Sequence, residues 1–307
     1  MEKCKIITPS ITVFNDEEKI DESGNKIVID HLINNGMDGI LALGSSGEFT
    51  TLSMEEKKEF FKFYYEYTDN RVELYAGTGD LKLENAVELS NYVLDLGYKA
   101  AVIVTPYYYG LNQERIYAYY DKLAKNIKGD IFIYNFPART GNSINKDTLK
   151  NLLIENKNIK GLKDSVLDYY HTTALLRELD SDFKYFELYS GYDDQFLINI
   201  FNNGAGCIAA LSNIVPEIWK DWVRAANNKD FSTLNNIQLC INKLMPLYDL
   251  DSNFSLLFKE LMKHRGLDIN TKSIFPFTPL DEKIIKEAKD LLDLVLKEYK
   301  SIGKQCL

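Results

Sequence analysis

Basic residues are in the minority in this sequence of 307 residues. Its 36 lysines and arginines stand against 45 aspartates and glutamates, a net charge of −9 at pH 7. This balance excludes overall attraction to nucleic acid or to an anionic membrane surface. No apolar run approaches the roughly 18 residues that a membrane-spanning helix needs, and the opening MEKCKIITPS lacks the pattern of a signal peptide. We therefore expect a cytoplasmic protein with no nucleic-acid or membrane partner.

Cysteine and histidine are also scarce. The four cysteines are far apart and show no CxxC spacing: Cys4, Cys207, Cys240 and Cys306. The three histidines, His31, His171 and His264, are equally scattered. Neither a disulfide framework nor a zinc site is expected from such spacing, and we predict reduced thiols and no bound metal.

Short β-branched runs alternate with longer helical patterns along the first two thirds of the chain. Eight runs are typical of strands: Lys5–Ile7, Gly39–Leu43, Val72–Ala76, Ala101–Thr105, Ile131–Asn135, Ile159–Lys163, Phe186–Ser190 and Cys207–Ala210. Alternation of this kind implies parallel strands joined by right-handed crossovers. Eight units favour a closed (β/α)₈ barrel, of the α/β class, over an open sheet.

The helical patterns between these runs begin near Gly24, Met54, Leu83, Gln113, Lys146, Asp168 and Asp193. Ser53 followed by Glu56 predicts a capping box, and Asn112 and Asn145 are candidate N-caps. Four further helices follow without strand signals: Pro216–Asn227, Phe231–Leu247, Asn253–His264 and Asp281–Ile302. One would close the barrel, so we predict a barrel domain over residues 1–227 and a C-terminal helical domain over 228–307.

Lys163 stands at the end of a predicted strand, where the active sites of βα barrels lie. Strand alternation places Gly161 and Ile159 on the same inner face, with Gly161 leaving open space beneath the amine. Desolvation there favours the neutral lysine, which is the nucleophile that forms a Schiff base with a ketone. The alternative is a lysine that reaches from the rim to water.

Other polar side chains follow neighbouring strands. Tyr134 would reach the same lumen, where a phenol bonded to the hydroxyls of Ser45 and Tyr108 can shuttle protons; a packing role is the alternative. The Gly44–Gly47 turn offers hydroxyls and backbone N–H groups to a carboxylate or phosphate, or is an ordinary connection. Arg139 can hold a carboxylate in a bidentate pair, or form a surface ion pair.

Together these motifs resemble the dihydrodipicolinate synthase / N-acetylneuraminate lyase superfamily of pyruvate-dependent class I aldolases. The resemblance spans essentially the whole chain, through Ile7-Thr-Pro9, Gly44-Ser-Ser-Gly-Glu48, Gly77-Thr-Gly79, Thr105-Pro-Tyr-Tyr108, Tyr134-Asn-Phe-Pro137, Gly161-Leu-Lys-Asp164 and Gly191-Tyr-Asp-Asp194. It implies a (β/α)₈ barrel, small-molecule substrates (pyruvate and an aldehyde), a covalent imine with no metal or other cofactor, and a homotetramer built from two tight dimers.

The resemblance also implies residue roles. Lys163 would form the imine with pyruvate or another 2-oxo acid. Tyr134 would move protons in a relay with Ser45 and with Tyr108, the latter donated across a dimer interface. The pyruvyl group would be held by Ser46 and by the backbone at Ile208.

Departures from the best-known members bear on the substrate. Ser45 and Ser46 stand where synthases usually carry threonines, and Tyr109-Gly110 replaces the usual Asn-basic-Pro, whereas Arg139 matches the synthase arginine for the second substrate's carboxylate. Gly191-Tyr-Asp-Asp-Gln-Phe196 and Ala210-Leu-Ser-Asn213 resemble 2-keto-3-deoxy-sugar-acid aldolases.

These two aldolase-like segments add Gly191, Asp193 and Ser212 to the predicted substrate-binding residues. Asp193 and Asp194 would bind sugar hydroxyls or cap a helix. The sequence thus favours aldol cleavage of a 2-keto-3-deoxy sugar acid over condensation of pyruvate with aspartate semialdehyde. Sialic-acid cleavage and a non-catalytic keto-acid sensor are less favoured.

Overall fold

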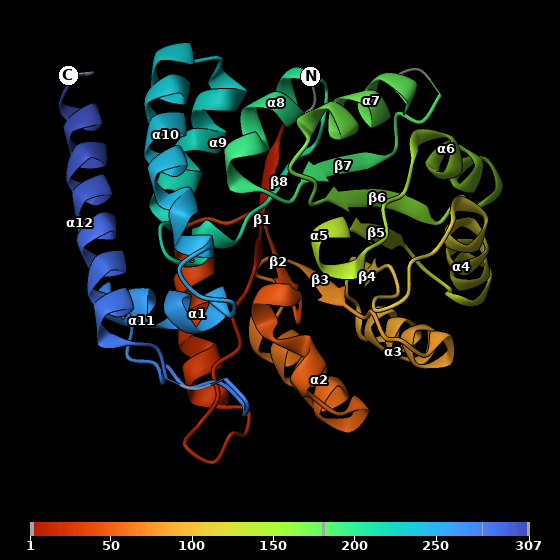
Figure 1. Ribbon diagram of the computed structural model, residues 1–307, viewed down its shortest axis with the longest axis horizontal. Helices are drawn as coiled ribbons and strands as arrows, with labels where there is room; N and C mark the ends of the chain where they lie inside the picture. Colours follow the sequence, from red (N-terminus) through yellow and green to blue (C-terminus); the bar gives the residue numbers. More distant parts are fainter. Residues whose placement is uncertain (1–2, 180–181, 278, 306–307) are drawn as a thin grey trace.

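Eight parallel strands close into a barrel in chain order, and helices surround it (Figure 1). The computed structural model describes residues 3–179, 182–277 and 279–305. The strands are β1 (Lys5–Pro9), β2 (Gly39–Ala42), β3 (Glu73–Gly77), β4 (Ala100–Val104), β5 (Ile131–Asn135), β6 (Ile159–Asp164), β7 (Glu187–Ser190) and β8 (Gly206–Ile208). β8 pairs with β1 and closes the ring. The (β/α)₈ prediction is confirmed.

The helices that connect the strands are α1 (Glu22–Asn34), α2 (Met54–Thr68), α3 (Leu83–Leu96), α4 (Gln113–Asn126), α5 (Pro137–Thr140), α6 (Lys146–Glu155), α7 (Tyr169–Leu179) and α8 (Phe196–Phe201). All of them except α5 begin close to the predicted positions. Ser53 and Glu56 form the predicted capping box at the start of α2. Asn112 and Asn145 accept backbone N–H groups as N-caps of α4 and α6. The short α5 has no counterpart in the sequence-based prediction.

The inner face of β6 differs from the prediction. The pairing of β5 with β6 shifts between Ile131 and Phe132, so that Ile159 lies opposite Ile131 and Gly161 lies opposite Phe132. This irregularity turns Ile159 outward into the apolar cluster between sheet and helices. The space at Gly161 is not open either, because a side chain there would meet the Phe132 ring at 2.6 Å. The aromatic ring in the lumen replaces the predicted void.

The last part of the chain is helical, as predicted. It consists of α9 (Pro216–Asn228), α10 (Phe231–Leu244), α11 (Phe254–His264) and α12 (Glu282–Gln305), gathered on the side of the barrel that carries α1 (Figure 1). One apolar cluster runs from Ile40 of β2 through Ile237 of α10 to Leu292 of α12. This core is therefore continuous across residue 227, and the division into two domains stays a prediction.

Cys4, Cys207 and Cys240 are free and buried, whereas Cys306 lies outside the described residues. Within the described ranges, no helix is both long enough and apolar enough to cross a membrane.

Candidate active site

A cavity of about 390 Å³ opens at the carboxyl ends of the strands. Lys163 from the end of β6 and Tyr134 from β5 line its centre, and Ser45 and Ser46 line the part next to β2. Ile208 of β8 forms another wall. Parallel strands bring their carboxyl ends to one rim, which is why residues from four strand ends meet here.

Lys163 points into this cavity and away from bulk water. It is 4% exposed, and its Nζ lies 4.4 Å from the centre of the Tyr134 ring. Within the described ranges, no carboxylate lies within ion-pair distance of Nζ. The amine thus lies on an aromatic face inside the cavity instead of extending to solvent, which disagrees with the rim alternative.

Tyr134 connects the lysine with the loop after β2. Its hydroxyl lies 3.4 Å from Ser45 Oγ, and its ring stacks on Phe136 with centres 5.7 Å apart. Both rings are therefore held by packing while the hydroxyl faces the cavity. A phenol held in this way, with a second hydroxyl beside it, can pass a proton between substrate and solvent.

The two serines stand on a short 3₁₀ turn, Ser45–Gly47, which ends at Glu48 in the left-handed region, φ 56°. Ser46 is buried and lines the cavity. Its hydroxyl can bond a carboxylate group seated beside Lys163. The turn is thus a second wall of the site, and its position depends on what holds Glu48.

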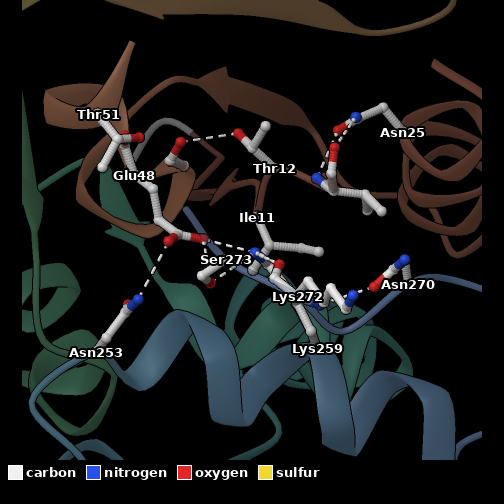
Figure 2. A network of polar contacts seen from close by, with 12 residues as sticks. Ile11, Thr12, Asn25, Glu48, Thr51, Asn253, Lys259, Asn270, Lys272 and Ser273 are labelled. Atoms are coloured by element: carbon white, nitrogen blue, oxygen red, sulfur yellow. Dashed lines mark hydrogen bonds and ion pairs between the residues drawn. The ribbon is translucent and has the colours of Figure 1, made fainter. Parts of the chain in front are cut away.

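Glu48 is held by a buried ion pair with α11 (Figure 2). Lys259 of α11, fully buried, donates to Glu48 Oε1 at 2.6 Å, and Asn253 donates to Oε2 at 3.1 Å. Ser273 also donates to Oε1, at 3.2 Å. Burial lowers the pKa of Lys259, and the charge of Glu48 opposes that effect. The serine turn is therefore fastened to α11 by charges that have lost their contact with water.

We expect Lys259→Met to lower the free energy of unfolding by about 3–5 kcal/mol, because it leaves the Glu48 carboxylate buried without a counter-charge. Chemical denaturation at one fixed protein concentration measures the change. Adding Glu48→Gln should restore much of the loss, since the second substitution removes the uncompensated charge.

Lys243→Met is the matched control, because Lys243 also joins two helices through an ion pair, with Glu298, but both side chains are more than a third exposed. We expect a loss below about 1 kcal/mol there. Equal losses in the Lys259 and Lys243 variants would contradict a special role of the buried pair.

Arg139 lies at the mouth of the cavity. Its guanidinium is near the rings of Phe136 and Phe254, 5.7 and 5.8 Å from their centres. No ion pair of Arg139 occurs within the described ranges, so the surface-pair alternative does not apply there. Two aromatic neighbours hold the side chain while its N–H groups stay available to an anionic or hydroxylated ligand.

Gly191 also lines the cavity, and the structure explains why it has no side chain. A Cβ at this position would collide with Ser165 Oγ, and Ser165 itself faces the cavity. Only glycine leaves the Ser165 hydroxyl in place at the end of β6.

Asp193 and Ser212 do not reach the cavity. Asp193 is fully buried and accepts hydrogen bonds from Tyr248 (2.6 Å) and from the backbone of Leu211 (3.2 Å); burial raises its pKa to about 7. Neither direct contact with sugar hydroxyls nor helix capping by Asp193 agrees with this placement, because the 3₁₀ turn at 193–195 has no side-chain cap. Asp193 contacts Tyr248, which lines the cavity.

Ser212 is buried behind β1 and β8. Its hydroxyl donates to the carbonyl of Ala209 at 2.5 Å and lies 2.7 Å from Thr8 Oγ1. Both contacts fasten the turn after β8, so in this structure Ser212 supports the wall and does not line it.

Tyr108 is the one predicted catalytic residue that this chain does not bring to the others. It is 84% exposed and adopts φ 87°, with its ring against Tyr109. The cross-dimer role that the resemblance implies for Tyr108 stays a prediction.

The sequence-based prediction missed the residues that close the mouth. Tyr248 and Asp249 come from the segment between α10 and α11, Phe254 is the first residue of α11, and all three line the cavity. No local pattern marks them, because they follow a helix of the C-terminal region. Within the described ranges, His, Cys, Asp and Glu side chains form no group of three or more that could hold a metal ion; the expected independence from metals stays a prediction.

Fold and site together define a (β/α)₈ protein with a buried lysine at the end of its sixth strand. Residues 2–294 match the Dihydrodipicolinate synthetase family. The putative 2-dehydro-3-deoxy-D-gluconate aldolase YagE of Escherichia coli (strain K12) is 30% identical over 287 residues, 94% of this chain and 95% of that protein. The crystal structure of YagE in complex with pyruvate superimposes with a TM-score of 0.93 at 29% identity, covering 96% of this chain and 99% of that one.

A 4-hydroxy-tetrahydrodipicolinate synthase is also similar. The protein from Hydrogenobaculum sp. (strain Y04AAS1) is 32% identical over 297 residues, 96% of this chain and 98% of that protein. The chain belongs to the dihydrodipicolinate synthetase family, and the resemblance inferred from its motifs is confirmed.

Proposed function

We propose that this protein is a carbon–carbon lyase that forms a Schiff base between Lys163 and a 2-oxo acid, and that it reversibly cleaves a 2-keto-3-deoxy sugar acid to pyruvate and an aldehyde. The placement of Lys163 carries the proposal: a buried strand-end amine on the Tyr134 ring, inside a cavity with a hydroxyl-bearing turn. Membership of the family and the similarity to YagE support it.

The reaction would proceed through an imine. The neutral amine of Lys163 attacks the keto carbon C2, and uptake of one proton with loss of water leaves a protonated imine. A base removes the proton of the C4 hydroxyl, the C3–C4 bond breaks, and its electron pair moves toward the imine nitrogen, releasing the aldehyde. The remaining enamine takes a proton at C3, and water hydrolyses the imine to free pyruvate and lysine.

Tyr134 is the group we assign to these proton transfers. Its ring lies 4.4 Å from the Lys163 amine and its hydroxyl lies 3.4 Å from Ser45 Oγ, so the proton can pass outward through Ser45. Ser46 and the backbone at Ile208 would hold the pyruvyl carboxylate. The protonated imine nitrogen itself draws the electrons of the broken bond, so this chemistry requires neither a metal nor another cofactor.

We further propose a cytoplasmic homotetramer built from two tight dimers, in which Tyr108 completes the relay of the partner subunit. The exposure of Tyr108 and Tyr109, 84% and 75%, supports this assembly.

Condensation of pyruvate with aspartate semialdehyde is the second candidate. The free guanidinium of Arg139 favours it, since that substrate brings a carboxylate to the mouth of the cavity. The similarity to the Hydrogenobaculum synthase supports it too. Both reactions share the imine at Lys163 and differ only in the second substrate.

A panel assay tests the choice: pyruvate release from several 2-keto-3-deoxy sugar acids, beside condensation of pyruvate with aspartate semialdehyde. We expect release from at least one sugar acid to exceed condensation. Efficient condensation without any sugar-acid cleavage would reverse the ranking.

Arg139→Leu should separate the two substrates. Pyruvate sits deeper, against Ser46, so imine formation with pyruvate should persist, and sugar-acid cleavage should continue with a changed KM. Any condensation of aspartate semialdehyde should lose about 2–5 kcal/mol of transition-state stabilisation, because the substrate carboxylate loses its charged partner. Steady-state kinetics of both reactions measure this.

Arg224→Leu on α9 makes the same substitution outside the cavity, at an exposed pair with Asp221, and should leave both reactions unchanged. Complete loss of imine formation in Arg139→Leu would contradict the placement of Arg139 beyond the pyruvate position.

A further inference from the structure

The residues that follow Tyr134 and Lys163 join the two strand ends on the side that faces away from the cavity. Tyr134 pairs with Lys163 across β5 and β6, and Asn135 pairs with Asp164. Asn135 donates from Nδ2 to Asp164 Oδ1 at 2.8 Å, and both side chains are fully buried. A shift of Asp164 would therefore move Lys163 and Tyr134 together.

Asp164 is a buried carboxylate with hydrogen-bond partners on α7. Its Oδ2 accepts from Thr172 Oγ1 at 2.6 Å and from His171 Nδ1 at 3.0 Å. A carboxylate removed from water needs a positive partner. Within the described ranges, His171 is the group within ion-pair distance of Asp164.

His171 carries that positive charge for a geometric reason. Its other nitrogen, Nε2, lies 2.8 Å from the carbonyl oxygen of Ile144. An ionised carboxylate and a backbone carbonyl can only accept hydrogen bonds, and a neutral imidazole has a single N–H, so both contacts form together only with the imidazolium. Burial disfavours the charged ring, but Asp164, the Ile144 carbonyl and the charge of Asp168 outweigh it and raise the pKa of His171.

The hydrogen bonds around Ile144 continue to the loop that carries Tyr108, residues 105–112 between β4 and α4, called the Tyr108 loop below. The backbone N–H of Ile144 donates to Asn135 Oδ1 at 3.1 Å, so the chain at Ile144 is held on both sides. Two residues earlier, Asn142 donates from Nδ2 to the carbonyls of Pro106 (2.6 Å) and Tyr109 (3.1 Å). These carbonyls flank Tyr108.

We propose that His171 is a positioning residue: as an imidazolium held between Asp164 and Ile144, it fixes the strand ends that carry Tyr134 and Lys163 and braces the Tyr108 loop. We call the two contacts of His171, with Asp164 and with Ile144, the His171 clamp. The effect of His171 on turnover rests on the proposed function, whereas the clamp itself rests on the contacts above. Because the folded pKa is raised, the clamp is intact below the unfolded value of about 6.5. It is lost as pH rises through the folded pKa.

The test compares wild type with His171→Gln, which removes the charge and cannot donate in both directions. The readout is the rate of imine formation with pyruvate, trapped by cyanoborohydride across the pH range. At about pH 6 we expect the variant to be on the order of tenfold slower, since small displacements of reacting groups are costly. The ratio of the wild-type rate to the variant rate should approach one above the pKa of His171, because the wild-type imidazole has then lost its charge as well.

His264→Gln is the matched control, because His264 also contacts a carboxylate, Asp293, but lies between α11 and α12, away from the barrel mouth. It should follow wild type at every pH. A ratio of one at low pH, or a constant ratio at all pH values, would overturn the positioning role.

A second measurement stands even if His171→Gln does not fold. The sequence has three histidines, so ¹³C labelling of their rings in wild type gives three resolvable titrations. A folded pKa of His171 above about 6.5 supports the imidazolium clamp, and a value below it overturns the clamp. Absence of any imine in wild type would instead overturn the proposed function, which keeps the two failures distinct.

Discussion

Lys163→Ala abolishes covalent capture of pyruvate: this is the largest effect we expect. Lys163 supplies the only amine that we assign to imine formation, and alanine cannot form the bond. Treatment with pyruvate and borohydride should add the mass of one reduced pyruvyl group to the wild-type peptide containing Lys163. The variant should show no adduct and no turnover, while its unfolding curve stays close to that of wild type.

Lys160→Ala is the matched control on the same strand. The Lys160 amine lies over the Tyr185 ring, 4.7 Å from its centre, and does not line the cavity. This variant should be labelled like wild type. Labelling at a lysine other than Lys163 would refute the assignment.

Tyr134→Phe should lower kcat by roughly two or more orders of magnitude, the usual scale of a positioned acid–base group. The ring still stacks on Phe136 and still lies beside the Lys163 amine, so the fold and the pocket remain. What is lost is the hydroxyl that exchanges protons with substrate and with Ser45. Single-turnover kinetics, together with the thermal midpoint, separate this loss from a loss of structure.

Tyr119→Phe removes a hydroxyl outside the cavity and serves as the control. The Tyr119 hydroxyl is buried and has no hydrogen-bond partner within the described ranges. Its removal should leave kcat unchanged. Near-wild-type turnover in Tyr134→Phe would reduce Tyr134 to a packing role.

Local sequence was sufficient to predict the barrel and the centre of the candidate site. Strand runs, capping residues and helix starts are short-range features, so the capping box at Ser53 and the N-caps at Asn112 and Asn145 agree with the structure. Once eight parallel strands are placed, their carboxyl ends share one rim. For that reason Lys163 and Tyr134 could be paired from their positions alone.

Local sequence was not sufficient where a residue's role depends on a distant partner. The shifted pairing of β5 with β6 turned Ile159 outward and placed the Phe132 ring at Gly161. Asp193 follows a strand end like the other candidates, yet its partner Tyr248 is 55 positions away and turns it from the cavity.

The charged supports of the site were equally hidden. Glu48 and Lys259 are 211 positions apart, and His171 appeared as one of three scattered histidines until the structure placed it between Asp164 and Ile144. A buried charge is stable only beside its partner. Sequence alone thus determined the strands, the helix starts and the amine at a strand end. Only the tertiary structure decided which charges pair in the buried interior and so how firmly that amine is held. The reason is that contacts between distant segments exist only once the barrel has closed.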